Sequence, residues 1–233
     1  MFWLVRAAAL GLLTLLFAAC GTVSTPAVKN TSRTFTTVVV DAGHGGKDNG
    51  AVRRYGPAEK HAALDVATRL ARKLRESQFK TVMTRSTDVF IPLDERAAIG
   101  RAQRNSLFVS IHFNDTRRRA IRGFETYYHS PVAYPLAVRI QRRLLTIRGA
   151  VNRGVHRANF RVLRKAIYPS VLVECGFLSN RSEGSEAGSS AFREILADKI
   201  AEAIVEERYG AGVYRGPPNA TPPSDAAGST AEP

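Results

Sequence analysis

Ser170-Val171-Leu172-Val173-Glu174-Cys175-Gly176-Phe177-Leu178-Ser179-Asn180 is the stretch of sequence that decides the fold. Its run of β-branched and leucine residues predicts a buried strand, with Glu174 at the carboxyl end and Gly176 just beyond it. In open α/β sheets, ligands bind beyond the carboxyl ends of the strands. A lone carboxylate is costly to bury. Glu174 therefore either pairs with an arginine and holds a loop, or belongs to a functional site.

The amino-terminal residues have the pattern of a secretory signal. Arg6 precedes an apolar run over residues 7–17, and Ala18-Ala19-Cys20-Gly21 follows it. The run is too short for a comfortable membrane span. A cysteine directly after two alanines resembles a bacterial lipoprotein box, in which Cys20 is acylated and becomes the new amino terminus. Phe17 stands where that box usually has leucine, so ordinary signal-peptidase cleavage stays open as the alternative.

We expect four segments along the chain. Residues 1–19 are the expected signal peptide, and residues 20–34, rich in Thr, Ser and Pro, are the expected flexible tether. Residues 35–209 are long enough for one domain with its own core. Residues 210–233, rich in Pro, Gly, Ala and Ser, are expected to be a disordered tail. The only two cysteines are Cys20 and Cys175, so an acylated Cys20 leaves Cys175 unpaired, as an inert buried thiol.

The chain is strongly basic. Its 34 lysines and arginines against 20 acidic residues give a net charge of +14. Together with export, this charge argues against nucleic acid and favours an anionic envelope polymer or membrane surface as the partner. Plain solubility explains the same excess equally well.

Strand and helix patterns alternate along the domain. The expected strands cover residues 35–41, 79–85, 107–112, 123–128 and 171–174, and the expected helices begin at Pro57 and cover residues 93–104, 134–147 and 192–205. This alternation predicts a single-domain α/β fold with a largely parallel, twisted sheet flanked by helices. In the first helix, Glu59 heads an apolar stripe with Ala63, Leu70 and Leu74, which sends its carboxylate inward. Alternatively, Glu59 only pairs with the amino end of that helix.

Three potential metal ligands lie at strand ends or helix starts. His44 follows the first expected strand, His112 ends the third, and Glu59 is the inward group. Two imidazoles and one carboxylate form a known catalytic zinc set, with a fourth position left for water. Their spacing matches no local zinc-finger pattern. The prediction depends instead on all three lying at one edge of the sheet, together with Glu174.

Each of these residues also has a plainer interpretation. The turn Gly43-His44-Gly45-Gly46-Lys47-Asp48 could cradle a phosphate, although it fits neither the dinucleotide fingerprint nor a P-loop. His112 alone would more often be a hydrogen-bonded core residue. Three further histidines are rival ligands, of which His61 lies off the core face of its helix, and His129 and His156 have no carboxylate cue.

Four motifs, in order, carry a resemblance to a known family. They are Asp41-Ala42-Gly43-His44-Gly45-Gly46, Glu59-Lys60, Ser110-Ile111-His112-Phe113-Asn114 and Val171-Leu172-Val173-Glu174-Cys175-Gly176-Phe177-Leu178-Ser179-Asn180. Thr84-Arg85, Arg96, Tyr127-Tyr128, Asn152-Arg153-Gly154-Val155 and Arg161-Val162-Leu163-Arg164 also fall in family order. Over residues 37–204 the chain thus resembles the zinc-dependent N-acetylmuramoyl-L-alanine amidases of the Amidase_3 type.

The resemblance implies a peptidoglycan hydrolase that cleaves the amide between N-acetylmuramic acid and the L-alanine of the stem peptide. It implies one zinc ion per chain, held by His44, Glu59 and His112, and makes residues 35–209 the zinc amidase catalytic domain. Glu174 would be the catalytic carboxylate, which takes the proton of zinc-activated water and returns it to the leaving amine.

Residues near this set are candidates for supporting roles. Asp41 and Asn114 are candidates for orienting the ligand imidazoles, the alternative for Asp41 being a plain turn residue. Residues 115–122 are too few for the helical plug of some family members, so we expect a constitutively open site. Arg117-Arg118-Arg119 either meets stem-peptide carboxylates or forms a solvated turn.

The sequence therefore predicts an enzyme of the cell envelope, periplasmic or extracytoplasmic, that is anchored to a membrane through lipid on Cys20. We expect it to act as a monomer on peptidoglycan, and not on nucleic acid. Two alternatives stay open: another zinc peptidase of the wall, and a non-hydrolytic peptidoglycan-binding or activator protein. The intact set of ligands and Glu174 argues against the non-hydrolytic alternative, since degenerate relatives lose such residues.

Overall fold

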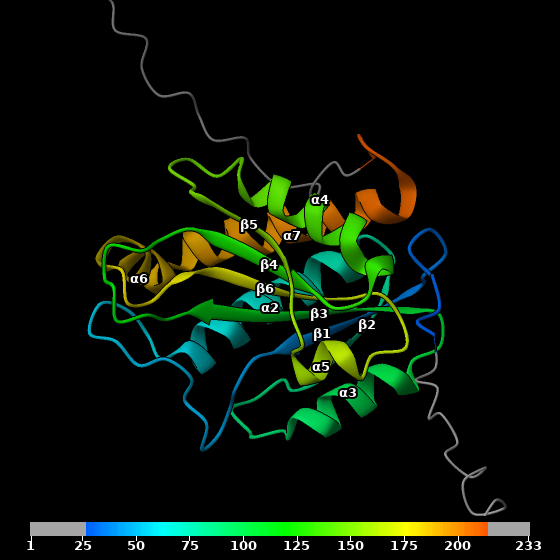
Figure 1. The fold of residues 1–233 in the computed structure, drawn as a ribbon, viewed down its shortest axis with the longest axis horizontal. Helices are drawn as coiled ribbons and strands as arrows, with labels where there is room; N and C mark the ends of the chain where they lie inside the picture. Colours follow the sequence, from blue (N-terminus) through cyan, green and yellow to red (C-terminus); the bar gives the residue numbers. More distant parts are fainter. Residues whose placement is uncertain (1–26, 214–233) are drawn as a thin grey trace, which may run out of the picture.

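A six-stranded sheet forms the centre of the computed structural model, which describes residues 27–213. The strand order is β2-β1-β3-β6-β4-β5. β4 runs antiparallel to β6, and the other neighbouring strands are parallel. Helices cover both faces of the sheet (Figure 1). The elements are β1 (Thr37–Ala42), α2 (Glu59–Glu76), β2 (Lys80–Met83), α3 (Leu93–Ala102), β3 (Ser106–Asn114), β4 (Phe124–Tyr128), η1 (Pro131–Ala133), α4 (Tyr134–Leu144), β5 (Asn152–Arg157), α5 (Arg161–Arg164), β6 (Ser170–Phe177), α6 (Arg181–Gly188) and α7 (Ser190–Tyr209).

β1 lies inside the sheet and is buried on both faces. All six of its residues are buried, as expected for a continuous apolar run in a parallel sheet. Val38 and Val40 belong to one hydrophobic cluster, and Val39 belongs to another on the opposite face. β1 pairs with β3 in parallel up to Ala42 and Ile111, so the two strands reach the same edge of the sheet together.

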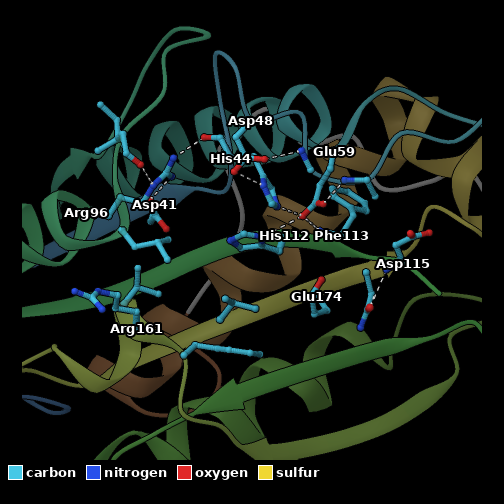
Figure 2. A pocket seen from close by; sticks show the side chains of 18 of the residues that line it. Asp41, His44, Asp48, Glu59, Arg96, His112, Phe113, Asp115, Arg161 and Glu174 are labelled. Carbon is cyan, nitrogen blue, oxygen red and sulfur yellow. Dashed lines mark hydrogen bonds and ion pairs between the residues drawn. The ribbon is translucent and has the colours of Figure 1, made fainter.

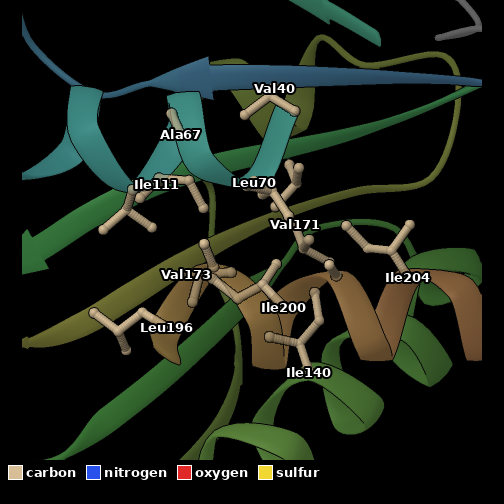
Figure 3. Close-up of a cluster of buried hydrophobic side chains, with 14 of the residues drawn as sticks. Val40, Ala67, Leu70, Ile111, Ile140, Val171, Val173, Leu196, Ile200 and Ile204 are labelled. Atoms are coloured by element: carbon tan, nitrogen blue, oxygen red, sulfur yellow. The ribbon is translucent and has the colours of Figure 1, made fainter. Parts of the chain in front are cut away.

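The larger hydrophobic cluster lies between the sheet and helices α2, α4 and α7 (Figure 3). Leu70 of α2, Ile140 of α4 and Ile200 of α7 are fully buried there. Burying each such side chain stabilises the fold by about 1.5–3 kcal/mol. The smaller cluster, which includes Phe108 and Leu163, lies on the face that α3 and α5 cover. The core therefore fixes α2, and with it Glu59, against the sheet.

The structure confirms the predicted fold class and the type of each predicted element, but it moves two boundaries that matter. β6 continues to Phe177, so Glu174 lies inside the strand and not at its carboxyl end. β3 continues to Asn114, and the register of its pairing with β6 shifts after His112. Four elements were missed, because β5 is a polar edge strand and η1, α5 and α6 are short.

The packed part of the chain also begins earlier than predicted. The tether was expected to reach residue 34, yet Thr31 and Ser32 are buried. The Thr31 hydroxyl donates to the carbonyl of Ser106 at 2.7 Å, and the Lys29 N–H donates to the carbonyl of Ile167 at 2.9 Å. These contacts tie the segment to the start of β3 and to the connection before β6.

Several predictions concern the ends of the chain. The predicted signal peptide, Cys20, and the predicted tail from residue 214 onward lie outside the residues that the structure describes. Between residues 27 and 213, no helix has the length and apolar character needed to cross a membrane.

Candidate active site

His44, Glu59 and His112 meet at the edge of the sheet where β1 and β3 end (Figure 2). His44 comes from the turn after β1, Glu59 from the first residue of α2, and His112 from β3. One ligand atom of each residue lies within 4.8 Å of the others. Glu59 Oε1 is 3.0 Å from His44 Nε2 and 3.0 Å from His112 Nδ1. The structure thus brings together the three residues that the sequence predicted as a set.

Glu59 is buried, and backbone groups hold its carboxylate as well. The Ala51 N–H donates to Oε2 at 2.9 Å, and the Phe113 N–H donates to Oε1 at 3.1 Å. Burial alone would raise the pKa of Glu59, but the hydrogen bonds from His112 and His44 lower that pKa well below its usual range. Glu59 is therefore an ionised carboxylate in the folded protein.

His44 sits in a strained turn and is oriented by Asp48. Its φ of +57° lies in the left-handed region, which costs a non-glycine residue about 1 kcal/mol or more. His44 Nδ1 is 2.9 Å from Asp48 Oδ2, which leaves Nε2 directed at Glu59. Burial alone would lower the pKa of His44, but its hydrogen bonds with Glu59 and Asp48 raise the pKa to about 9. Asp48 was not among the residues predicted for the site, although it follows His44 by four residues in the same glycine-rich turn.

Asp41 does not contact a ligand imidazole, which corrects its predicted role. The buried carboxylate accepts hydrogen bonds from Thr84 and Ser110, both at 2.6 Å, and from Arg96 at 2.9 Å. Arg96 also donates to the carbonyl oxygen of His44 at 2.5 Å. Asp41 therefore acts on the site through Arg96, which holds the backbone of the turn that carries His44.

Two glycines allow the cluster to pack directly against the backbone. A Cβ atom on Gly43 would lie 2.4 Å from the imidazole carbon Cε1 of His112. A Cβ atom on Gly50 would lie 2.5 Å from Glu59 Oε2. Real Cβ contacts are never so short, because atoms at that distance overlap. The glycine-rich turn after β1 thus makes room for the ligand cluster, which favours this role over a phosphate cradle.

Glu174 faces the cluster from β6. It is paired in register with His112 of β3 on one side and with Glu125 of β4 on the other. Within residues 27–213, its Oε2 is buried and has no hydrogen-bond partner. Burial raises the pKa of Glu174 to about 7; the nearby His112 opposes this shift, and Glu59 and Glu125 add to it.

A hydrogen-bond network behind Glu174 corrects the predicted role of Asn114. The Asn114 amide donates to Glu125 Oε2 at 2.7 Å, and not to a ligand imidazole. Tyr127 also donates to Oε2 of Glu125, at 2.8 Å, and Arg153 pairs with Oε1 at 2.7 Å. Glu125 was missed by the sequence analysis. A charge in an otherwise apolar strand pattern, as in Phe124-Glu125-Thr126, is the signal that could have found it.

The rival histidines stay outside the cluster. His129 Nδ1 is 3.0 Å from the carbonyl oxygen of Ala158, His156 Nε2 is 2.7 Å from that of Arg153, and His61 is exposed on α2.

Cys175, next to Glu174, has its side chain in the larger hydrophobic cluster and is 1% exposed. Burial raises the pKa of its thiol well above the ordinary value. It is thus a protonated core thiol, as the sequence predicted.

The cluster and Glu174 line a pocket of about 760 Å³, a size suited to a small organic ligand. His112 lies between two ends of this pocket, one marked by Arg161 and the other by Asp115 (Figure 2). Beside Arg161 the lining is apolar and includes Phe160, Leu93 and Leu172. The connection over residues 115–122 contains no helix, in line with the short loop that the sequence predicted.

The donor set suits a zinc ion. Catalytic zinc sites use three protein ligands, commonly imidazole nitrogens and a carboxylate oxygen, and keep one position open. His44, Glu59 and His112 offer this set. Ligands of zinc are also held by partners on their remaining polar atoms. Asp48 provides this for His44, and the Ala51 N–H provides it for Glu59.

Comparisons with known sequences agree with this geometry. Residues 38–206 match the Amidase_3 family, described as N-acetylmuramoyl-L-alanine amidase. YqiI of Bacillus subtilis is 40% identical over 172 residues, which cover 72% of this chain and 82% of YqiI. The N-acetylmuramoyl-L-alanine amidase LytC of the same organism is 37% identical over 172 residues, 72% of this chain but only 34% of LytC. The probable cell wall amidase LytH of Staphylococcus aureus is 32% identical over 174 residues, 72% of this chain and 57% of LytH. This chain thus spans most of YqiI, but only a part of the other two.

Solved structures show the same fold. The N-acetylmuramoyl-L-alanine amidase AmiC2 of Nostoc punctiforme matches with a TM-score of 0.71 and 37% identity, over 73% of this chain and 95% of that one. The catalytic domain of CwlV, an N-acetylmuramoyl-L-alanine amidase from Bacillus (Paenibacillus) polymyxa, matches with a TM-score of 0.70 and 34% identity, over 74% and 97%.

Because the pKa of Glu174 is raised, we expect Glu174→Gln to increase the free energy of unfolding of the metal-free protein relative to the unmodified chain. This increase should be larger near pH 8 than near pH 5. The folded pKa of about 7 exceeds the ordinary 4.5, so protonated Glu174 favours folding below 4.5, and this contribution is lost as the pH rises through 7. Ionised Glu174 then costs up to about 3 kcal/mol, which glutamine avoids. Urea unfolding of both proteins with a chelator measures the difference. A difference that does not change with pH would contradict this prediction.

Proposed function

We propose that this chain, which belongs to the Amidase_3 family of N-acetylmuramoyl-L-alanine amidases, is a zinc-dependent enzyme that hydrolyses the amide between N-acetylmuramic acid and the L-alanine of the stem peptide. One observation carries the proposal. The potential ligands His44, Glu59 and His112 meet in a pocket that also holds the buried, unpartnered Oε2 of Glu174. A buried acid beside a metal-binding set is an arrangement that supports amide hydrolysis by general acid–base catalysis.

The proposed mechanism assigns the proton transfers to Glu174. A zinc ion on His44, Glu59 and His112 would lower the pKa of a water molecule and polarise the carbonyl group of the substrate. Glu174 Oε2 accepts a proton from the attacking water while the water oxygen bonds to the carbonyl carbon. The carboxyl group then gives this proton to the leaving nitrogen as the C–N bond breaks, so the stem peptide departs with a free amino group. In the protein without metal, burial raises the pKa of Glu174 to about 7, which favours a group that both accepts and releases a proton near neutral pH.

Other residues of the site position these groups and do not react. Asp48 fixes the ring of His44, and Arg96 fixes the backbone that carries it. Glu125, which lies opposite Glu174 in the sheet, adds negative charge that disfavours ionised Glu174. Asn114, Tyr127 and Arg153 hold Glu125 in place.

Digestion of purified sacculi should release intact stem peptides that begin with a free L-alanine, because the cleaved bond joins this residue to the sugar. Amino-terminal labelling followed by mass spectrometry of the soluble fraction identifies the products. Peptides cut between stem amino acids would instead indicate another zinc peptidase of the wall. Binding to sacculi with no soluble product would indicate a non-hydrolytic wall-binding or activator protein.

Glu174→Gln should retain the zinc content of the unmodified protein but lose turnover by roughly 100-fold or more, because the proton carrier is gone while the ligands stay. His112→Ala is the matched variant and should lower the bound zinc, because it removes a ligand. Elemental analysis and sacculus digestion measure the two properties. Unchanged turnover in Glu174→Gln would remove its assigned role, and a full zinc content in His112→Ala would show that another residue is the ligand.

We further propose that the enzyme works outside the cytoplasm, held to a membrane by lipid on Cys20. The support is the signal-like pattern of residues 1–19, which ends in Ala-Ala before Cys20. Mass spectrometry of the mature protein should find Cys20 acylated at the amino terminus, and Cys20→Ser should move the protein from the membrane to the soluble fraction. A mature chain that begins at another residue would contradict the anchor.

A further inference from the structure

A second hollow, of about 380 Å³, contains a cluster of arginines. Tyr55 and Ser179 line it, and none of its described lining residues is acidic. Its four arginines are Arg53, Arg54, Arg117 and Arg119. We call it the arginine hollow.

The arginine hollow is built from loops that adjoin the catalytic elements. Residues 52–55 precede α2, which begins at Glu59, and residues 116–119 follow β3, which carries His112. Ser179 follows β6, and its hydroxyl accepts a hydrogen bond from the Thr116 N–H at 3.1 Å. The hollow is therefore fixed relative to Glu59, His112 and Glu174 by direct chain connections.

One carboxylate already sits at the boundary between the arginine hollow and the active-site pocket. Asp115 lines the active-site pocket, and Arg53 lines the hollow. Arg53 Nε donates to Asp115 Oδ1 at 2.7 Å, and Nη2 of the same guanidinium contacts Oδ2. This two-pronged contact is how arginine recognises a planar carboxylate. One arginine at the edge of the hollow thus already binds a carboxylate of the protein.

The remaining arginines of the hollow carry uncompensated charge. Within residues 27–213, none of the salt bridges involves Arg54, Arg117 or Arg119, and all three are exposed. The Arg54 guanidinium donates to the Tyr55 hydroxyl at 2.6 Å. This hydrogen bond, together with Arg119, lowers the pKa of the Tyr55 hydroxyl, which is consistent with a positive field in the hollow. Three arginines are thus available to an anionic ligand.

The other end of the active-site pocket lacks such charge. Arg161 is held by both carboxylate oxygens of Asp94, at 2.6 and 2.5 Å, and Arg96 is paired with Asp41. The pocket lining also includes the apolar side chain of Phe160, which precedes Arg161 in the sequence. The two arginines that line the active-site pocket itself are thus paired with carboxylates, whereas the arginine hollow beside Asp115 offers three arginines without a salt bridge among the described residues.

We propose that the arginine hollow binds the carboxylates of an acidic stem peptide, which runs from Glu174 past Asp115 while the sugar lies over the apolar end. This inference rests on the proposed function. It also decides between the two interpretations of Arg117-Arg118-Arg119. Arg117 and Arg119 line the hollow, whereas Arg118 does not. Arg118 thus offers a control of equal charge on the same loop.

The first test measures binding without turnover. The probes are N-acetyl-L-alanyl-D-glutamate, in which the acetyl group stands in for the lactyl group, and its uncharged diamide. Calorimetry with the Glu174→Gln protein should show binding of the acid about tenfold tighter than binding of the diamide. Added salt should reduce this preference, because it screens exposed charges. Equal affinity for the acid and the diamide would overturn the proposal, whatever the sacculus digestion shows.

The second test locates the preference in the arginine hollow. In the same Glu174→Gln background, Arg117→Gln combined with Arg119→Gln should weaken binding of the acid about tenfold and leave binding of the diamide unchanged. Arg118→Gln, the matched control, should change neither by more than about twofold. In the active enzyme, the double variant should raise KM for a soluble acidic muropeptide and leave kcat unchanged.

Three results would overturn this assignment. If Arg118→Gln loses as much affinity for the acid as the double variant does, the net charge of the surface, and not the hollow, attracts the peptide. A loss of kcat with KM unchanged would place the arginines in the chemistry. Inorganic polyphosphate could also bind more tightly than the acidic peptide and lose affinity in the same double variant. That result would identify a phosphate polymer as the partner. The calorimetric comparison of the acid with the diamide measures binding and not turnover, so its failure can be told apart from a failure of the proposed reaction.

Discussion

The buried carboxylate of Glu59 is the constraint on which the rest of the site depends. A buried carboxylate is tolerated only when its oxygens are paired. Here Oε1 alone meets two imidazoles and the Phe113 N–H. Since the apolar stripe of α2 fixes this helix on the sheet, the position of the carboxylate follows from the core. The turn after β1 and the carboxyl-terminal part of β3 must then bring His44 and His112 to that position. The site is thus assembled around a charge placed by hydrophobic packing.

The two glutamates of the pocket show how environment separates chemical roles. Glu59 accepts hydrogen bonds on both oxygens, and its pKa falls far below the usual range. Glu174 is buried as well, yet its Oε2 has no hydrogen-bond partner between residues 27 and 213, and its pKa rises to about 7. Hydrogen bonds to the ionised form favour ionisation, whereas burial without them opposes it. One carboxylate is thereby suited to bind a cation and the other to carry a proton.

Much of this arrangement could be predicted because it follows from local pattern. Apolar runs predicted the central strands. The apolar stripe of the first helix correctly predicted that Glu59 is buried against the core. The supporting contacts could not be predicted in the same way, since they depend on how segments meet in three dimensions. Asp41 was predicted to orient a ligand imidazole, but it pairs with Arg96. Arg96 comes from α3, which lies on the face of the sheet opposite α2. Glu125 faces Glu174 only because β4 runs antiparallel to β6, and strand order is not visible in periodicity.

Cys175 gives the protein an internal reporter of its own opening. Its protonated thiol lies in the core, directly after Glu174 on β6, and a thiol in that state reacts slowly with alkylating reagents. With Cys20 acylated or replaced, it is the remaining thiol of the sequence. Alkylation then requires that the core open around the sulfur atom, either at β6 or at the helices that cover this face of the sheet. The labelling rate therefore measures how often the core opens next to the strand that carries the proposed proton carrier.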